Sequence, residues 1–194
     1  MRWRVVLTVV CSGAVAVAAQ EPLSEAHIQE AIAVGRNCGD VPIVNVGAKA
    51  GDFTVYIEGP FARIALHAAA ARQMRQPFDA SKVTGDVAVP DYRIWAQYTL
   101  EGRRTVSVKR IVLQPAGKRA RGPVIQPVRD RPFQLTVGHL PAHGIINEVR
   151  WRNWEWIFDR LPGGEFQVIL ETSAGAQRYT VTERDVARLM RVCT

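Results

Sequence analysis

WEWIFDRLPGGEFQVIL, residues 154–170 of this 194-residue chain, places two aromatic and aliphatic runs on either side of a Leu-Pro-Gly-Gly corner. Proline presets φ for the first position of a turn, and glycine supplies the positive φ that follows. Trp154, Trp156 and Phe158 occupy alternate positions, so they share one face of a strand. The stretch therefore predicts two antiparallel strands joined at a tight corner, with Phe166 as a core anchor after it.

The first of these runs also fits a helix. Trp154, Ile157, Phe158 and Leu161 follow the i, i+3, i+4, i+7 spacing of an amphipathic helix. We favour the strand, because the aromatic density and the β-rich run after the corner both agree with it. The helix remains the alternative for residues 154–161.

The corner resembles a known structural pattern. F-x-x-L-P-x-G-x-F-x-V, residues 158–168, is similar to the strand-corner-strand pattern of bacterial immunoglobulin-like and transthyretin-like β-sandwich modules. Together with the run YIEGPF at residues 56–61, it also resembles uncharacterised secreted bacterial proteins. The resemblance implies a sandwich whose relatives mostly bind or space other molecules, and it implies no activity.

From Asp91 onward the pattern of apolar and polar residues is typical of β structure. We expect seven strands there, at Tyr92–Leu100, Thr105–Leu113, Phe133–Val137, Ile145–Trp151, Trp154–Leu161, Glu165–Thr172 and Arg178–Thr182. Their number and spacing are typical of an immunoglobulin-like sandwich. Thr182 and Asp185 resemble a capping box, so a short helix should follow the last strand.

Upstream of Asp91 the pattern predicts helices and short strands. The expected elements are a helix at 24–36, strands at 41–46 and 53–58, and a helix at 61–76. Ser24 can cap the first helix, and Gly35 and Gly39 bracket its end. Pro60 presets the first turn of the second helix, and the small alanines of this helix suit close packing on a sheet.

The predicted fold class is α+β with two parts. Residues 20–85 form an N-terminal helical segment with a short strand pair. Residues 86–194 form an antiparallel immunoglobulin-like β-sandwich of about seven strands with a short C-terminal helix. One shared core and two separate cores both remain open.

Residues 1–19 have the pattern of a secretion signal. Arg2 and Arg4 precede a short apolar core, and small residues follow at the cleavage positions. Because no second apolar run of membrane length follows, we expect a periplasmic or secreted protein without a transmembrane segment. Removing both arginines leaves 23 basic against 18 acidic residues, a net charge of +5. This moderately basic balance suits polyanionic surroundings.

Two cysteines remain after the expected signal, at Cys38 and Cys193. An even count in an oxidising compartment favours a disulfide between them. Because the enclosed loop is long, the bond would restrict the unfolded chain strongly. Two unpaired thiols are the alternative.

Basic residues concentrate between positions 103 and 131. The candidate anion or partner contacts are Arg103, Arg104, Lys118, Arg119 and Arg121. Arginine pairs bidentately with phosphate and carboxylate, so the hypothesis is contact with an anionic envelope polymer or an acidic protein partner. A solvated linker is the alternative.

The sequence holds no motif that identifies an enzyme. His139 and His143 are the one closely spaced histidine pair, and Pro141 and Gly144 argue against the helix that a zinc site would use. We therefore expect no catalytic residues, no metal and no cofactor. The predicted function is a non-enzymatic binding or interaction protein of the cell envelope. A secreted hydrolase-type enzyme with a site not visible in sequence is the alternative, export argues against nucleic acid, and the oligomeric state stays open.

Overall fold

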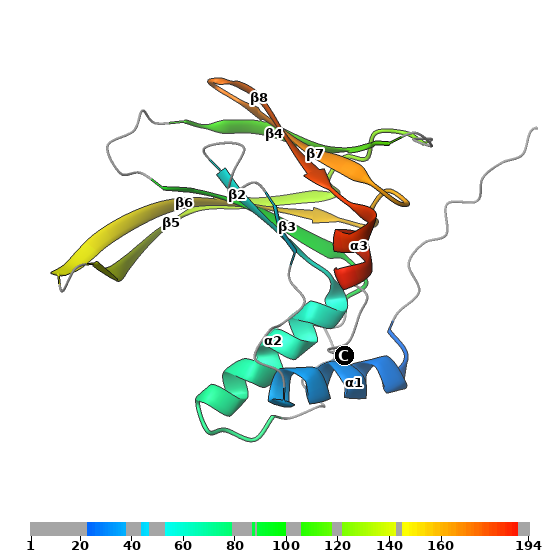
Figure 1. Cartoon of the computed structure of the whole chain (residues 1–194), viewed down its shortest axis with the longest axis vertical. Coiled ribbons are helices and arrows are strands. Elements are labelled where there is room, and N and C mark those ends of the chain that lie inside the picture. The colour runs from blue at the N-terminus through cyan, green and yellow to red at the C-terminus, as the bar shows by residue number, and fades with distance from the viewer. Residues whose placement is uncertain are drawn as a thin grey trace, which may run out of the picture.

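The computed structural model describes residues 23–37, 44–46, 53–78, 87, 89–99, 106–117, 122–142 and 145–189. Within these ranges the chain is a mixed α and β structure with three helices and two antiparallel sheets (Figure 1). The helices are α1 (Glu25–Asn37), α2 (Pro60–Gln73) and α3 (Glu183–Leu189). None of the helices in these ranges is long and apolar enough to cross a membrane.

The larger sheet, sheet A, has five strands in the order β1-β2-β3-β6-β5. Its strands are β1 (Val44–Val46), β2 (Phe53–Glu58), β3 (Tyr92–Thr99), β6 (Ile145–Phe158) and β5 (Arg129–Ala142). The smaller sheet, sheet B, has three strands in the order β4-β7-β8. Its strands are β4 (Val108–Pro115), β7 (Phe166–Thr172) and β8 (Gly175–Val181).

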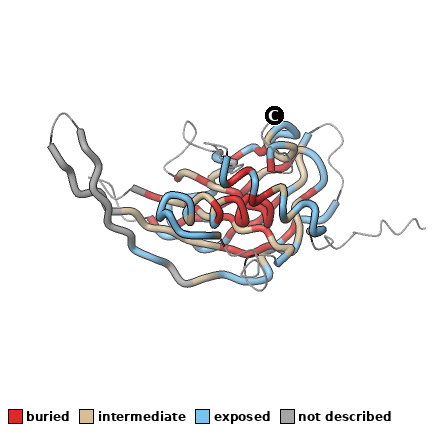
Figure 2. Tube along the Cα trace, turned by 90° about the horizontal axis from the view of Figure 1, so that it is seen from below, coloured by how far each residue is buried: buried red, intermediate tan, exposed pale blue. Residues whose placement is uncertain are grey.

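The main core lies between the two sheets. Sheet A contributes alternate residues of β2, β3 and β6, and sheet B contributes alternate residues of β4, β7 and β8. Phe53 lies in its aromatic part, with ring centroids 5.1 Å from Tyr98 and 5.7 Å from Trp154. Figure 2 shows the buried residues gathered in the body of the molecule. This arrangement of two packed antiparallel sheets agrees with the predicted sandwich at the level of layers.

The corner at residues 159–165 links the two sheets. Residues 154–158 belong to strand β6, so the strand prediction for this run is confirmed over the helix. Gly164 has φ of 75°, the positive value expected after the proline, and Phe166 is fully buried as predicted. However, β6 pairs with β3 and β5 while β7 pairs with β4 and β8, so the two strands do not pair with each other.

Several of the predicted strand bounds are wrong, and the strand expected at residues 133–137 is the longer β5. The separate strands expected at residues 145–151 and 154–161 form the single strand β6. Arg152 and Asn153 do not interrupt it, because they pair with β3 on one side and β5 on the other. Tertiary pairing outweighs the low strand propensity of such polar residues. Six strands therefore follow Asp91 in the described ranges, rather than seven.

Strands β1 and β2 belong to the same sheet as the later strands. Phe53 pairs with Tyr98 and Glu58 with Arg93, so sheet A crosses the boundary expected near residue 85. Phe53 and Val55 also lie in the main core. Whether residues 20–85 and 86–194 are separate domains stays a prediction, and the β2–β3 ladder is one of the contacts that join them.

Local sequence signals set the helix starts. The Ser24 hydroxyl oxygen accepts the His27 backbone N–H at 3.3 Å, and Pro60 opens α2 after Gly59. At α3, the Thr182 backbone N–H donates to Asp185 Oδ2 at 2.9 Å, and the Asp185 N–H donates to the Thr182 hydroxyl oxygen at 3.3 Å. This reciprocal pair confirms the predicted capping box.

The two N-terminal helices pack on each other and form a second, smaller core. Its buried members are Ala31, Ile32, Val34, Phe61, Ile64, Ala65 and Ala68. The expectation that the alanines of α2 pack on a sheet is wrong, because they contact α1. Arg72 of α2 also donates to the carbonyl oxygen of Arg36 at 2.7 Å, which caps the last turn of α1.

α1 ends at Asn37, between Gly35 and Gly39 as predicted, and Gly35 lies in its last turn. A Cβ atom at this position would lie 2.1 Å from the Ala65 carbonyl oxygen and 2.8 Å from Ala68 Cβ. The missing side chain therefore lets the two helix backbones approach closely.

Replacing Gly35 with alanine should destabilise the protein by roughly 1–3 kcal/mol, because the added methyl group has to push α1 away from α2. In an exposed helix the same change would stabilise by about 0.5–1 kcal/mol, so the sign of the effect tests the contact. Chemical denaturation gives the measurement, and Ala33→Ser on the exposed side of α1 is the control. A stabilised Gly35→Ala variant would show that the helices do not touch here.

Candidate functional site

The two faces of sheet A differ in chemistry. Along β2, Phe53, Val55 and Ile57 are buried in the main core, while Thr54 and Tyr56 alternate with them and are half-buried. We call the face that carries Thr54, Tyr56 and Glu58 the outer face. In Figure 1 sheet B lies above sheet A, and α1 and α2 lie below it, on the side of this face.

The strand register assembles the outer face into three rows across β2, β3, β6 and β5, because paired residues point to the same side. The first row is Thr54, Gln97, Asn153 and Gln134. The second row is Tyr56, Trp95, Glu155 and Arg131. The third row is Glu58, Arg93, Ile157 and Arg129. An amide-rich row thus lies beside an aromatic row, and charged residues gather at the end near α2.

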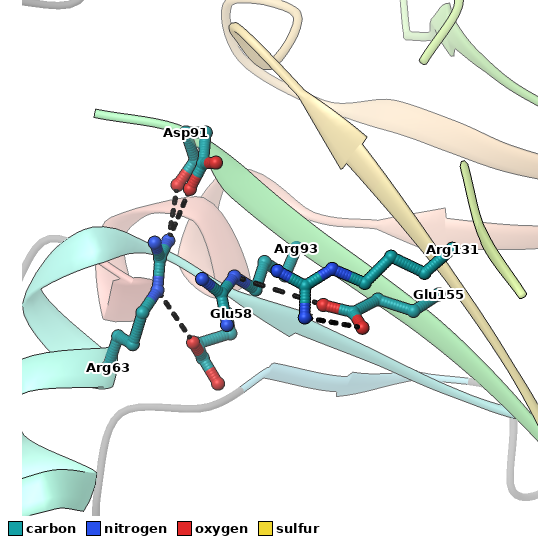
Figure 3. A network of polar contacts seen from close by, with 6 residues as sticks. All are labelled: Glu58, Arg63, Asp91, Arg93, Arg131 and Glu155. Atoms are coloured by element: carbon teal, nitrogen blue, oxygen red, sulfur yellow. Dashed lines mark hydrogen bonds and ion pairs between the residues drawn. The ribbon is translucent and has the colours of Figure 1, made fainter. Parts of the chain in front are cut away.

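Arg63 anchors the charged end of the outer face (Figure 3). It is 2 % exposed, and its Nε lies 3.0 Å from Glu58 Oε1. One terminal guanidinium nitrogen lies 2.7 Å from Asp91 Oδ1 and donates to the Asp91 carbonyl oxygen at 2.7 Å. Gly59 and Pro60 start α2 directly after Glu58, so the first turn of the helix carries Arg63 back to the sheet. The guanidinium therefore joins the end of β2, the start of β3 and α2.

A second group of ion pairs continues across the sheet. Glu155 on β6 lies between two arginines: Arg93 Nε is 3.8 Å from its Oε1, and Arg131 Nη1 is 3.6 Å from its Oε2 (Figure 3). Arg93 is also the register partner of Glu58. Three arginines and three carboxylates, carried by β2, α2, β3 with the residue just before it, β5 and β6, thus form one network.

Burial changes the ionisation of two members of this network. Burial raises the pKa of Glu58 above its ordinary 4.5, and the attraction of Arg63 opposes that rise without cancelling it. Burial lowers the pKa of Arg93, and repulsion from Arg63 adds to the decrease. Both directions follow from moving charged groups out of water.

The network suits a structural role more than acid–base catalysis. Perturbed carboxylates often mark active sites, but Glu58 is 3 % exposed and its charge is held by Arg63. Asp91 and Glu155 are also engaged with arginines. Across the part of the chain that the structure describes, no group of three or more His, Cys, Asp or Glu residues is placed to hold a metal ion.

Two aromatic side chains occupy the middle of the outer face. Tyr56 and Trp95 are register partners, and their rings meet edge to face with centroids 6.4 Å apart and planes at 81°. Both are half-buried, so each ring is supported by the sheet and keeps some contact with solvent. Exposed aromatic rings on a rigid sheet are typical of contact surfaces.

Most of the sequence-predicted site residues lie outside the described ranges. These are Cys38, Cys193, Arg103, Arg104, Lys118, Arg119 and Arg121, and His143 joins them. The disulfide and the anion contact therefore stay predictions. His139 lies on β5. In the basic segment at residues 103–131, Lys109 and Arg110 are exposed on β4, and Arg129 is exposed on β5. The structure brings Arg131 of this basic segment into the network, beside Glu155.

Sequence reasoning missed the outer face and its network. Two signals could have found them. Arg63 stands among apolar residues in the run PFARIA at the start of a helix, where a buried arginine demands acidic partners. The alternation Tyr56-Ile57-Glu58 and Arg93-Ile94-Trp95 also places aromatic and charged residues together on the side away from the core.

Comparison with models of protein families, with curated proteins and with solved structures finds no match for this chain.

Replacing Arg63 with methionine should cost about 3–5 kcal/mol of stability, because Glu58 and Asp91 would lose the charge that compensates their burial. Denaturant unfolding measures the change. Arg188→Met, at an exposed position of α3, removes an arginine that remains in contact with water and should stay within about 0.5 kcal/mol of the parent. Equal stabilities for both variants would show that the ion pairs of Arg63 contribute nothing.

The raised pKa of Glu58 predicts a specific pH dependence. In the unfolded chain the pKa of Glu58 is near 4.5, so above this pH the unfolded state releases a proton that the folded state retains. The free energy of unfolding therefore falls as the pH rises toward the folded-state pKa of Glu58. Glu58→Gln cannot release this proton. The unfolding free energy of the parent should therefore fall relative to the variant from about pH 4.5 upward and then level off.

Denaturant titrations between pH 4 and 8 give this difference curve, and Glu171→Gln on an exposed position of β7 controls for the loss of one negative charge. A difference that is constant over the range, or that grows in favour of the parent, would contradict the raised pKa.

Proposed function

We propose that this protein is an exported, non-enzymatic binding protein of the cell envelope and that the outer face of sheet A is its contact surface. The observation that carries the proposal is the Tyr56–Trp95 pair, which lies in the middle of a face whose other side chains in the three rows are polar, apart from the buried Ile157. Aromatic residues surrounded by polar groups are typical of binding surfaces.

The construction of the face supports binding. Its residues on β2, β3 and β6 stand on paired strands whose opposite side is packed into the main core, so these backbone positions are fixed before a ligand arrives. A pre-organised surface loses little conformational entropy on binding. The carboxylates at its charged end are engaged with arginines, which favours binding over hydrolysis.

Two further parts of the proposal concern the fold and the location. We assign the two packed sheets to the immunoglobulin-like or transthyretin-like sandwiches, and the agreement of the corner and of Phe166 with that pattern supports this assignment. Export to the periplasm or the medium is supported by the signal pattern of residues 1–19. An oxidising location would also suit a disulfide between Cys38 and Cys193.

Trp95→Ala should reduce retention of the mature protein on a cell-envelope preparation by about thirtyfold, as expected when a central aromatic contact worth about 2 kcal/mol is lost. Co-sedimentation at a series of protein concentrations measures the affinity. Leu135→Ala is the matched control, because Leu135 is an exposed apolar residue of β5 whose register places it on the opposite face of sheet A. Equal retention of Trp95→Ala and the parent would disprove a contact through this face.

A further inference from the structure

We infer that the outer face of sheet A binds an uncharged carbohydrate chain, which lies across the strands along the amide row and stacks on Trp95 and Tyr56. This inference depends on the proposed function and names the ligand class of the same surface. It is argued from three properties of the face: its aromatic rings, its amide groups and its balanced charges.

The aromatic pair offers what a sugar ring requires. The apolar C–H faces of a sugar ring can stack on an aromatic ring, whose face carries partial negative charge. Trp95 is half-buried between its register partners Tyr56 and Glu155, and the edge-to-face contact with Tyr56 fixes the relative orientation of the two rings. Stacking on rings that are already held in place requires little ordering on binding.

The amide row offers hydrogen bonds of both kinds. Gln97 and Gln134 each carry a carbonyl acceptor and an NH₂ donor, and Thr54 carries a hydroxyl group that can donate and accept. Sugar hydroxyl groups also donate and accept, so the two sets match. Four neighbouring strands span roughly 14 Å, which is wider than one sugar ring and therefore suits a chain.

The charges of the face favour a neutral ligand. The three arginines of the network, Arg63, Arg93 and Arg131, are balanced by three carboxylates within 4.0 Å of them. Each positive charge is thus engaged inside the protein instead of being offered to a ligand. Of the described residues on the three rows, Arg129 adds one further charge, and it lies on the edge strand β5, away from Trp95. An anionic polymer would find its complement in the basic segment at residues 118–121 instead.

The test uses an array of neutral and anionic oligosaccharides with the mature protein. Neutral oligosaccharides should bind, and binding should change less than twofold between low and physiological salt, because no net charge is neutralised. Titration of the best neutral oligosaccharide should show a loss of at least tenfold in affinity for Trp95→Ala and a measurable loss for Gln97→Ala. Leu135→Ala should bind as the parent does, and circular dichroism should confirm that all variants are folded.

A triple variant separates the outer face from the basic segment. Lys118→Ser, Arg119→Ser and Arg121→Ser together should leave neutral binding unchanged. The inference would be overturned if the protein bound only anionic oligosaccharides, if this binding weakened steeply with salt, and if the triple variant no longer bound them. Binding would then belong to the basic segment.

The remaining outcomes distinguish the inference from the proposed function. One outcome is that no oligosaccharide binds but Trp95→Ala still reduces retention on the envelope preparation. The inferred carbohydrate ligand would then be wrong, while the outer face would remain the contact surface, with a protein as its partner. If a neutral oligosaccharide binds equally to the parent, Trp95→Ala and Gln97→Ala, the outer face is not the site and the inference is overturned.

Discussion

The burial of one guanidinium group constrains the arrangement of the helices on the sheet. Arg63 is 2 % exposed, and removing its charge from water costs several kcal/mol unless acidic groups and hydrogen bonds compensate it. The compensating groups, Glu58 and Asp91, come from the end of β2 and the start of β3. Because Gly59 and Pro60 start α2 directly after β2, few placements of the helix bring Arg63 to both carboxylates. The ion pairs thereby couple the path of the chain after β2 to the register between β2 and β3.

This coupling matters because most of the described buried apolar residues form two clusters, one between the sheets and one between α1 and α2. Hydrophobic burial has no preferred direction, so neither cluster determines the angle between helices and sheet. Ion pairs that include hydrogen bonds are directional, so they can determine this angle. The raised pKa of Glu58 shows that its pairing does not fully offset its burial. The network therefore specifies an arrangement more than it adds net stability, which agrees with the modest net contribution of buried ion pairs in general.

The features that sequence could predict are those that depend on near neighbours. Ser24 and Thr182 cap helices through residues three positions away, and the corner glycine adopts positive φ for local steric reasons. β2 was also predicted with its observed bounds, because strict alternation identifies a strand. What sequence missed concerns distant contacts: Gly35 lies against Ala65 of another helix, and β6 is continuous because it has a partner on each side. The network was missed for the same reason, since its pairs join strands and helices that only the folded chain brings together.

The outer face and the network depend on each other. Glu155 is the register partner of both Trp95 and Arg131, so the aromatic row and the ion pairs share a residue. Through Arg93 and Arg131, Glu155 links β3, β6 and β5 on the outer side of the sheet. These links restrain the strands that position the aromatic and amide rows. Because the charged side chains of the outer face pair with one another, the groups that remain for a ligand are aromatic rings and neutral hydrogen-bonding groups. The same pairing that holds the sheet therefore also determines which kind of molecule the face can recognise.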